Sequence, residues 1–262
     1  MIDGLCENCG AHLVGDYCHL CGQRELDGDW QSIGAILRHF WDELVSFDFK
    51  TAHTLVALLR PGELPAAFIA GRRRRYLGPL KVYFLCAGIF FIVGPRVSGF
   101  SLERQLAHDP DGTRHARIER RIAETHVSAE LFSERFGGTL QRVYTLMPVF
   151  SVFATTLILR MLYRRSVPWL GPHMIFSLYY IAFWYLMAIP VGAVNEAFDG
   201  RALPVLAVQY GIVAPYAFFA MLRVYKEPPR VTLLKCALLL MIAFVIDSPL
   251  NVAAEAASIA LT

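Results

Sequence analysis

Long apolar runs alternate with short polar segments over the last two thirds of the chain. Five runs approach the roughly 20 residues that a helix needs to cross a bilayer, and basic or turn-forming residues bound each of them. We expect membrane-spanning helices at 79–100, 143–163, 169–194, 203–225 and 231–254. The polar segment 101–142 then forms an extended loop after the first helix.

A different pattern precedes the first apolar run. Apolar positions recur every three or four residues from Ile33 to Val45, which predicts an amphipathic helix too polar to span a membrane. A second short amphipathic stretch, 51–60, ends at the turn-forming pair Pro61-Gly62. We therefore divide the chain into a cysteine-rich segment at 1–25, interfacial helices and a basic run at 26–78, and a membrane domain at 79–262.

The composition supports this assignment to an all-α integral membrane protein. Apolar residues make up 55% of the chain and charged residues 18%, whereas about a quarter of a soluble domain is charged. The net charge of +3 is too small to indicate nucleic-acid binding, and the arginines cluster beside the apolar runs instead. We expect membrane lipids as partners and no nucleic acid.

Basic residues predict the orientation. They gather before the first span, after the second, and between the fourth and fifth, so the positive-inside rule places these regions and the N-terminus in the cytoplasm. Residues 1–30 contain no apolar h-region, so we expect the first span to act as its own insertion signal.

Four of the six cysteines lie near the N-terminus, in two Cys-x-x-Cys-Gly motifs: Cys6 with Cys9, and Cys18 with Cys21. A two-residue gap lets both sulfurs of a pair face one ion, and the following glycine tolerates the positive φ of the turn. Four thiolates in tetrahedral reach suit Zn²⁺, with a rubredoxin-like iron site or two disulfides as alternatives. We expect a structural zinc ribbon, because four protein ligands leave no open position for a substrate.

Several motifs together resemble a known family. They are the double CxxCG segment, Phe47-Asp48-x-x-Thr51, Leu59-Arg60-Pro61-Gly62, and Gly71-x-Arg73-x-x-Tyr76-x-x-Pro79. This chain resembles, over residues 6–90, a family of bacterial integral membrane proteins catalogued as domain of unknown function 3667. The resemblance implies the architecture and a location in the bacterial inner membrane, and it implies no mechanism.

The basic run and the polar residues within the spans supply the remaining candidate sites. Arg72, Arg73, Arg74, Arg75 and Tyr76 are expected to contact lipid headgroups or another anion. Polar groups inside a bilayer are costly and become functional candidates: Asp247, Asn251, Glu196 and Gln209. Ser248 and Pro249 follow Asp247 directly, so we expect the last helix to break there.

Three functions fit these features. The first is a non-enzymatic membrane scaffold or regulator whose zinc ribbon docks a cytoplasmic protein or the helical bundle itself. The second is a small permease or channel with a polar path through Asp247. A lipid-modifying enzyme has the least support, because the sequence contains no nucleophile with a base and no recognised catalytic motif.

Overall fold

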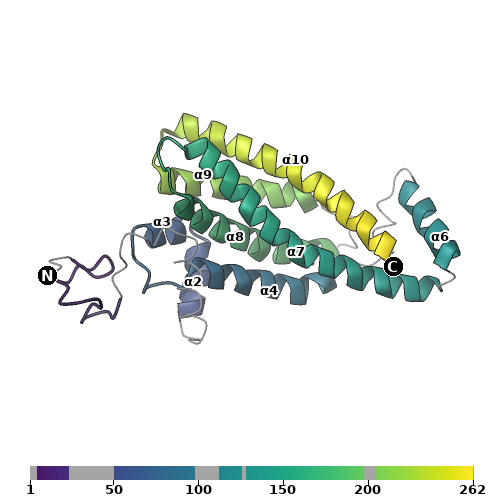
Figure 1. Cartoon of the computed structure of the whole chain (residues 1–262), viewed down its shortest axis with the longest axis horizontal. Coiled ribbons are helices and arrows are strands. Elements are labelled where there is room, and N and C mark those ends of the chain that lie inside the picture. Colours follow the sequence, from purple (N-terminus) through teal and green to yellow (C-terminus); the bar gives the residue numbers. More distant parts are fainter. Residues whose placement is uncertain (1–4, 24–49, 98–111, 126–127, 198–204, 262) are drawn as a thin grey trace.

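The computed structural model describes residues 5–23, 50–97, 112–125, 128–197 and 205–261. Within these residues every regular element is a helix, apart from an isolated antiparallel bridge between Leu5 and His12. Figure 1 shows the long helices running along one axis, with the N-terminal segment at one end and α6 (Thr113–Thr125) at the other. The predicted all-α class is confirmed for this part of the chain. The predicted amphipathic helix at 33–45 lies outside the described residues.

Helix α8 (Leu170–Ala197) forms the centre of the bundle. Its sequence is apolar on all sides, and aromatic side chains such as Phe176, Tyr179 and Phe183 are buried in the main hydrophobic core. Helix α4 (Pro79–Val97) packs extensively along α8, while α7 (Ala129–Tyr163) and α9 (Val205–Tyr225) also contact it. Helix α10 (Pro229–Leu261) packs against α7 and α9.

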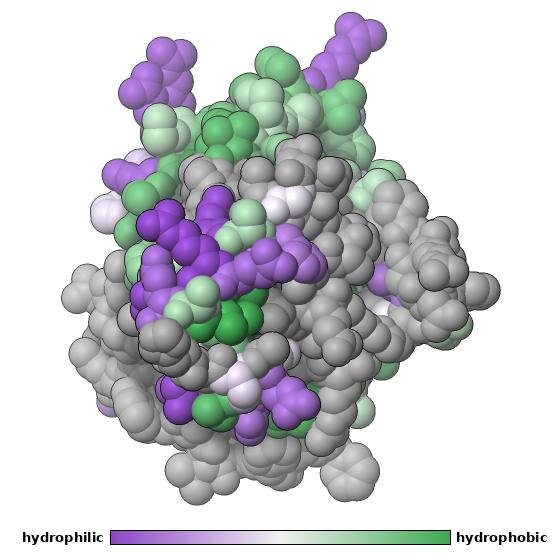
Figure 2. All heavy atoms as spheres, turned by 90° about the vertical axis from the view of Figure 1, so that its right-hand side faces the viewer, coloured by the Kyte–Doolittle hydropathy of each residue, from purple (hydrophilic) through white to green (hydrophobic). Residues whose placement is uncertain are grey.

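The outward faces of the bundle carry many large apolar side chains. On α7, Phe150, Phe153, Leu157 and Met161 are exposed at three- and four-residue intervals, so they lie on one face of the helix. Exposed apolar residues also occur on α4, α9 and α10: Phe84, Ile92, Ile212, Phe219, Leu233, Leu234, Met241, Phe244 and Val245. Figure 2, viewed from the α6 end, shows hydrophilic side chains gathered at that end and hydrophobic ones on the flank above them.

Two of the described helices are long and apolar enough to cross a membrane, namely 170–195 within α8 and 207–225 within α9. Shorter apolar helical stretches cover Pro79–Val93 and Met147–Tyr163. Two membrane-capable helices support a membrane protein weakly, and the five-span bundle remains a prediction.

Two boundaries differ from expectation. The expected loop 101–142 ends within α7, which runs unbroken from Ala129 into the apolar stretch. Ser128 starts this helix by accepting a hydrogen bond from the Leu131 backbone N–H, and Phe132 and Phe136 then bury themselves with Ile118 of α6. The polar segment 101–142 thus contains α6 and the start of α7, which a small second core holds together.

The expected break at Ser248-Pro249 is also wrong, because α10 is helical throughout. The residues that follow the proline are rich in alanine, the strongest helix former. Near the helix end, Ile259 packs into the cluster with α6 and α7. Both the helix propensity and this packing favour continuation.

Two short helices form a platform at the N-terminal end of the bundle, α2 (Lys50–Leu58) and α3 (Glu63–Ile69). The predicted turn between them is confirmed at Pro61-Gly62, where Gly62 has φ +70°. A Cβ at Gly62 would lie 2.9 Å from the Ala220 backbone of α9, so only glycine fits. The Tyr216 hydroxyl of α9 donates to the Leu58 carbonyl oxygen at 2.9 Å and ties α2 to the bundle.

Candidate metal centre and its docking site

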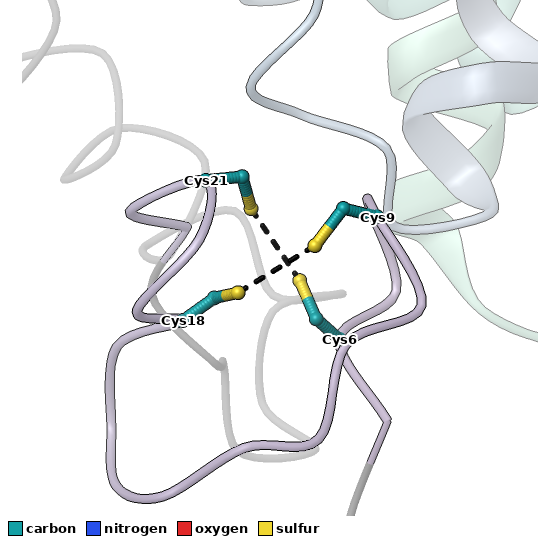
Figure 3. Close-up of side chains that lie close together, drawn as sticks. All are labelled: Cys6, Cys9, Cys18 and Cys21. Carbon is teal, nitrogen blue, oxygen red and sulfur yellow. Dashed lines mark hydrogen bonds between the residues drawn. The ribbon is translucent and has the colours of Figure 1, made fainter.

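Four cysteine sulfurs converge within the cysteine module, residues 5–23. The Sγ atoms of Cys6 and Cys21 are 3.6 Å apart, those of Cys9 and Cys18 are 3.5 Å apart, and all four lie within 4.8 Å of one another. The side chains point toward a common centre (Figure 3). Zinc–sulfur bonds of about 2.3 Å give a tetrahedral edge of about 3.8 Å, so this arrangement fits a four-coordinate ion.

The two halves of the module share one backbone design. The Gly10 N–H donates to the Cys6 carbonyl oxygen, and the Gly22 N–H donates to that of Cys18, each at 2.8 Å. Both glycines have positive φ, +76° and +67°, which a side chain would strain. The two CxxCG motifs therefore form matching tight turns, as their identical spacing predicts.

The four sulfur atoms are spaced to bind one cation and are too far apart for disulfide bonds. All six cysteines are free, and the sulfur separations greatly exceed the roughly 2.05 Å of a disulfide. The backbone N–H of Cys21, helped by that of Leu20 and by neighbouring thiols, lowers the pKa of Cys18 to about 6. The Ala11 backbone hydrogen bond lowers the pKa of Cys9, but desolvation and the neighbouring thiols outweigh it and raise this pKa to about 12. Four adjacent sulfurs cannot all ionise alone, so a metal ion would complete the set.

The module lies against the basic turn, residues 71–75. The Gln23 side-chain amide donates to the Gly71 carbonyl oxygen at 2.7 Å, and its oxygen accepts from the Arg73 backbone N–H at 3.3 Å. The Arg74 Nε–H donates to the Cys21 carbonyl oxygen at 3.0 Å. These three bonds join segments about 50 residues apart in the sequence, and they hold the second cysteine turn on the platform.

Close packing supports this contact. Gly71 has φ +81°, and a Cβ there would overlap the carboxylate of Glu7 and lie 2.8 Å from its Cβ. Desolvation lowers the pKa of Arg73, and the nearby Glu7 charge offsets only part of this shift. Arg73 is only 5% exposed and its guanidinium lies 5.7 Å from the centre of the Phe68 ring. The basic turn is therefore shaped to receive the module.

The other residues predicted in this region divide into two groups. Arg72, Arg74 and Arg75 are exposed, and their contact with lipid headgroups stays a prediction. Tyr76 is 5% exposed and donates from its hydroxyl to a Glu63 carboxylate oxygen at 2.7 Å. Desolvation raises the pKa of Glu63, but the Tyr76 hydrogen bond and the charges of Arg60 and Arg223 outweigh it and lower this pKa.

The predicted intramembrane polar site is only partly described. Gln209 is 3% exposed and donates from its amide to the Trp184 carbonyl oxygen at 2.9 Å, linking α9 to α8. The side chains of Asp247, Asn251 and Glu196 lie outside the described part of the structure. Their assembly into one site stays a prediction.

Sequence reasoning missed Gln23, Glu7 and Thr54. The buried Thr54 hydroxyl accepts from the Leu77 backbone N–H at 3.1 Å and donates to the Lys50 carbonyl oxygen at 2.6 Å. One signal was present: the motif Gly71-x-Arg73-x-x-Tyr76 marks the residues of this turn that face inward, whereas the residues between them include the exposed arginines.

Comparison with curated proteins found no match, and comparison with solved structures found none either. Residues 48–91 match the model of a family described as protein of unknown function (DUF3667). The matched segment contains α2, α3, the basic turn and much of α4, so it covers the platform on which the cysteine module lies. The match supports the family that the sequence motifs resemble.

Proposed function

We propose that this protein is a non-enzymatic regulator or scaffold of the bacterial inner membrane, in which a zinc-loaded cysteine module docks on its own bundle. The bundle has five spans and the N-terminus is cytoplasmic. The observation that carries the proposal is the three-bond contact between the module and the basic turn. Release of the module would expose both surfaces to a cytoplasmic protein partner.

The exposed apolar faces of α7 and α10 support insertion into lipid. Soluble monomers rarely leave contiguous apolar patches beyond a few hundred Å² exposed, because water contact with such surfaces is costly. A bilayer removes this cost for side chains such as Phe150, Phe153 and Leu157. The arginines at the C-terminal end of α7, Arg160, Arg164 and Arg165, suit a headgroup region on the same side as the basic turn.

Charge complementarity supports metal-dependent docking. A Zn²⁺ ion with four thiolates carries a net charge of about −2, and the basic turn contributes four arginines beside it. Without the ion, a module with Cys18 alone ionised would carry a charge of only about −1, and the module also loses the roughly 10–16 kcal/mol that zinc supplies to small finger peptides. Zinc loading thus strengthens both the fold of the module and its attraction to the turn.

Limited trypsin digestion tests the docking, because trypsin cleaves after arginine. The detergent-purified protein should contain one zinc per chain and resist cleavage at residues 72–75. The Cys6→Ser/Cys9→Ser variant should lose zinc and become sensitive there, while cleavage at the exposed Arg164 and Arg165 stays unchanged.

A second variant separates docking from metal binding. Gln23→Ala removes two of the three bonds and leaves the four sulfurs in place, so it should keep zinc and still become sensitive at the basic turn. Equal protection in the wild type, the cysteine variant and Gln23→Ala would refute the proposal.

One observation favours the permease as a second candidate. A cavity of about 70 Å³ lies between α7, α8, α9 and α10, and its lining residues include Ser151, Thr155 and Tyr210. The nearby Gln209 amide oxygen has no hydrogen-bond partner among the described residues. Unchanged flux across vesicles after Asp247→Asn would exclude the polar path that this candidate requires.

A further inference from the structure

A solvent-open recess lies where the cysteine module meets the platform. Its volume is about 490 Å³, and it is lined by Asn8, Cys21, Lys50, Arg74 and Arg75. These residues come from both cysteine turns, from the first residue of α2 and from the basic turn. The recess therefore exists as a complete shape only while the module is docked.

The lining is cationic. Among the described residues it consists of one lysine, two arginines, an asparagine and a cysteine, with no carboxylate. Two of the cations are held in place: the Arg74 Nε–H is bonded to the Cys21 carbonyl oxygen, and the Arg75 guanidinium lies 5.4 Å from the centre of the Tyr76 ring. Arginine has five N–H donors in a fixed plane, so Arg74 keeps four others for an acceptor.

This donor set selects the chemistry of the ligand. Planar guanidinium groups bind phosphate oxygens in pairs, lysine adds a point charge, and an amide adds a neutral donor. The metal–thiolate cluster that includes Cys21 would repel an anion, so anion binding needs the three cations that line the same recess.

We infer that this recess binds a phosphate group, carried by an anionic phospholipid headgroup or by a free phosphate compound. The inference rests on the proposed docking, since the module supplies Asn8 and the anchor for Arg74. It narrows the predicted anion contact at Arg72 to Arg75 to two of those arginines, Arg74 and Arg75, and adds Lys50 to them.

Binding to the zinc-loaded full chain in a phosphate-free maltoside detergent provides the test. One arm measures radiolabelled inorganic phosphate by equilibrium dialysis, and the other measures retention of phosphatidylglycerol by native mass spectrometry. Lys50→Gln and Arg75→Gln should each weaken binding about tenfold, because each removes one cation from the recess. Neither change should disturb docking, since the docking contacts do not include these two side chains. Arg72→Gln removes an equal charge from an exposed position outside the recess and should change binding less than about twofold.

The outcomes separate the possibilities. Loss of phosphate binding in the two variants supports a free phosphate ligand, and loss of lipid retention alone supports a headgroup; Lys50→Arg should restore either. Equal weakening by Arg72→Gln would overturn the site in favour of diffuse charge attraction. Absence of binding of both probes, with trypsin protection of the basic turn intact, would overturn the recess and leave docking standing. Absence of that protection in the wild type would overturn the docking itself.

Discussion

Replacement of Gly71 by alanine should release the cysteine module without removing its metal. The new Cβ would occupy the position of the Glu7 side chain, and alanine would also have to adopt φ +81°. A left-handed backbone costs an L-residue about 1–2 kcal/mol. If the turn relaxes to avoid this strain, the Gly71 carbonyl oxygen rotates away from the Gln23 amide.

The magnitude follows from the contact. Three hydrogen bonds at about 1 kcal/mol each hold the module on the turn, so a loss of 1–2 kcal/mol is a large share of the docking free energy. The docked population relative to the released one should fall about 5- to 30-fold. The rate of trypsin cleavage at residues 72–75 should rise by the same factor, while the zinc content stays at one ion per chain.

Gly112 provides the matched control. It also has positive φ, +64°, but a Cβ there would meet no atom within 4 Å. Gly112→Ala therefore carries the backbone strain without the collision and should leave cleavage at the basic turn unchanged. If Gly71→Ala protects that turn as well as Gly112→Ala does, Glu7 does not pack as described and the reasoning fails.

Three further variants test other parts of the structure. Thr54→Val leaves the buried Leu77 N–H without its acceptor and should lower the free energy of unfolding by about 1–3 kcal/mol, whereas Thr54→Ser should lower it much less; thermal unfolding measures both. The pKa of Glu63 is lowered in the folded protein, so the stabilisation by its carboxylate is present above about pH 4.5 and is lost as the pH falls further. Glu63→Gln should remove this part of the acid dependence. The same change of unfolding free energy with pH in both proteins would contradict this prediction. Phe153→Lys places a charge on the apolar face of α7, where a lysine in the bilayer centre costs about 3 kcal/mol, so it should reduce the fraction of protein that stays in membranes after carbonate extraction. Glu134→Lys, on the polar part of the same helix, should leave this fraction unchanged.

Local patterns predicted the parts of this protein that depend on neighbours in the sequence. The spacing of Cys6, Cys9, Cys18 and Cys21 specifies two turns that need no distant residue, and the sulfurs converge as expected. The apolar run at 169–194 predicted a helix for the same reason, and the structure has α8 there. Pro61-Gly62 marked its turn through backbone constraints alone.

Features that depend on distant contacts were not predictable in this way. Nothing in the local sequence of Gln23 distinguishes it from a solvated glutamine, and its role appears only when Gly71 lies beside it. Hydropathy likewise placed Tyr76 at a headgroup boundary, although Glu63 satisfies its hydroxyl inside the protein. The packing of the polar start of α7 against α6 and the end of α10 likewise depends on distant residues.

The length of α7 has a geometric consequence. Its 35 residues rise to about 52 Å, against a bilayer hydrocarbon core of about 30 Å. If α7 is the second span, a third or more of its length must extend beyond the hydrocarbon core or tilt within it. The N-terminal end of α7 packs against α6 and the end of α10. Its C-terminal end leads into a loop in which the Pro168 carbonyl oxygen accepts a hydrogen bond from the Arg160 side chain. One long helix thus connects the α6 cluster with the end of the bundle that carries α2 and α3 (Figure 1).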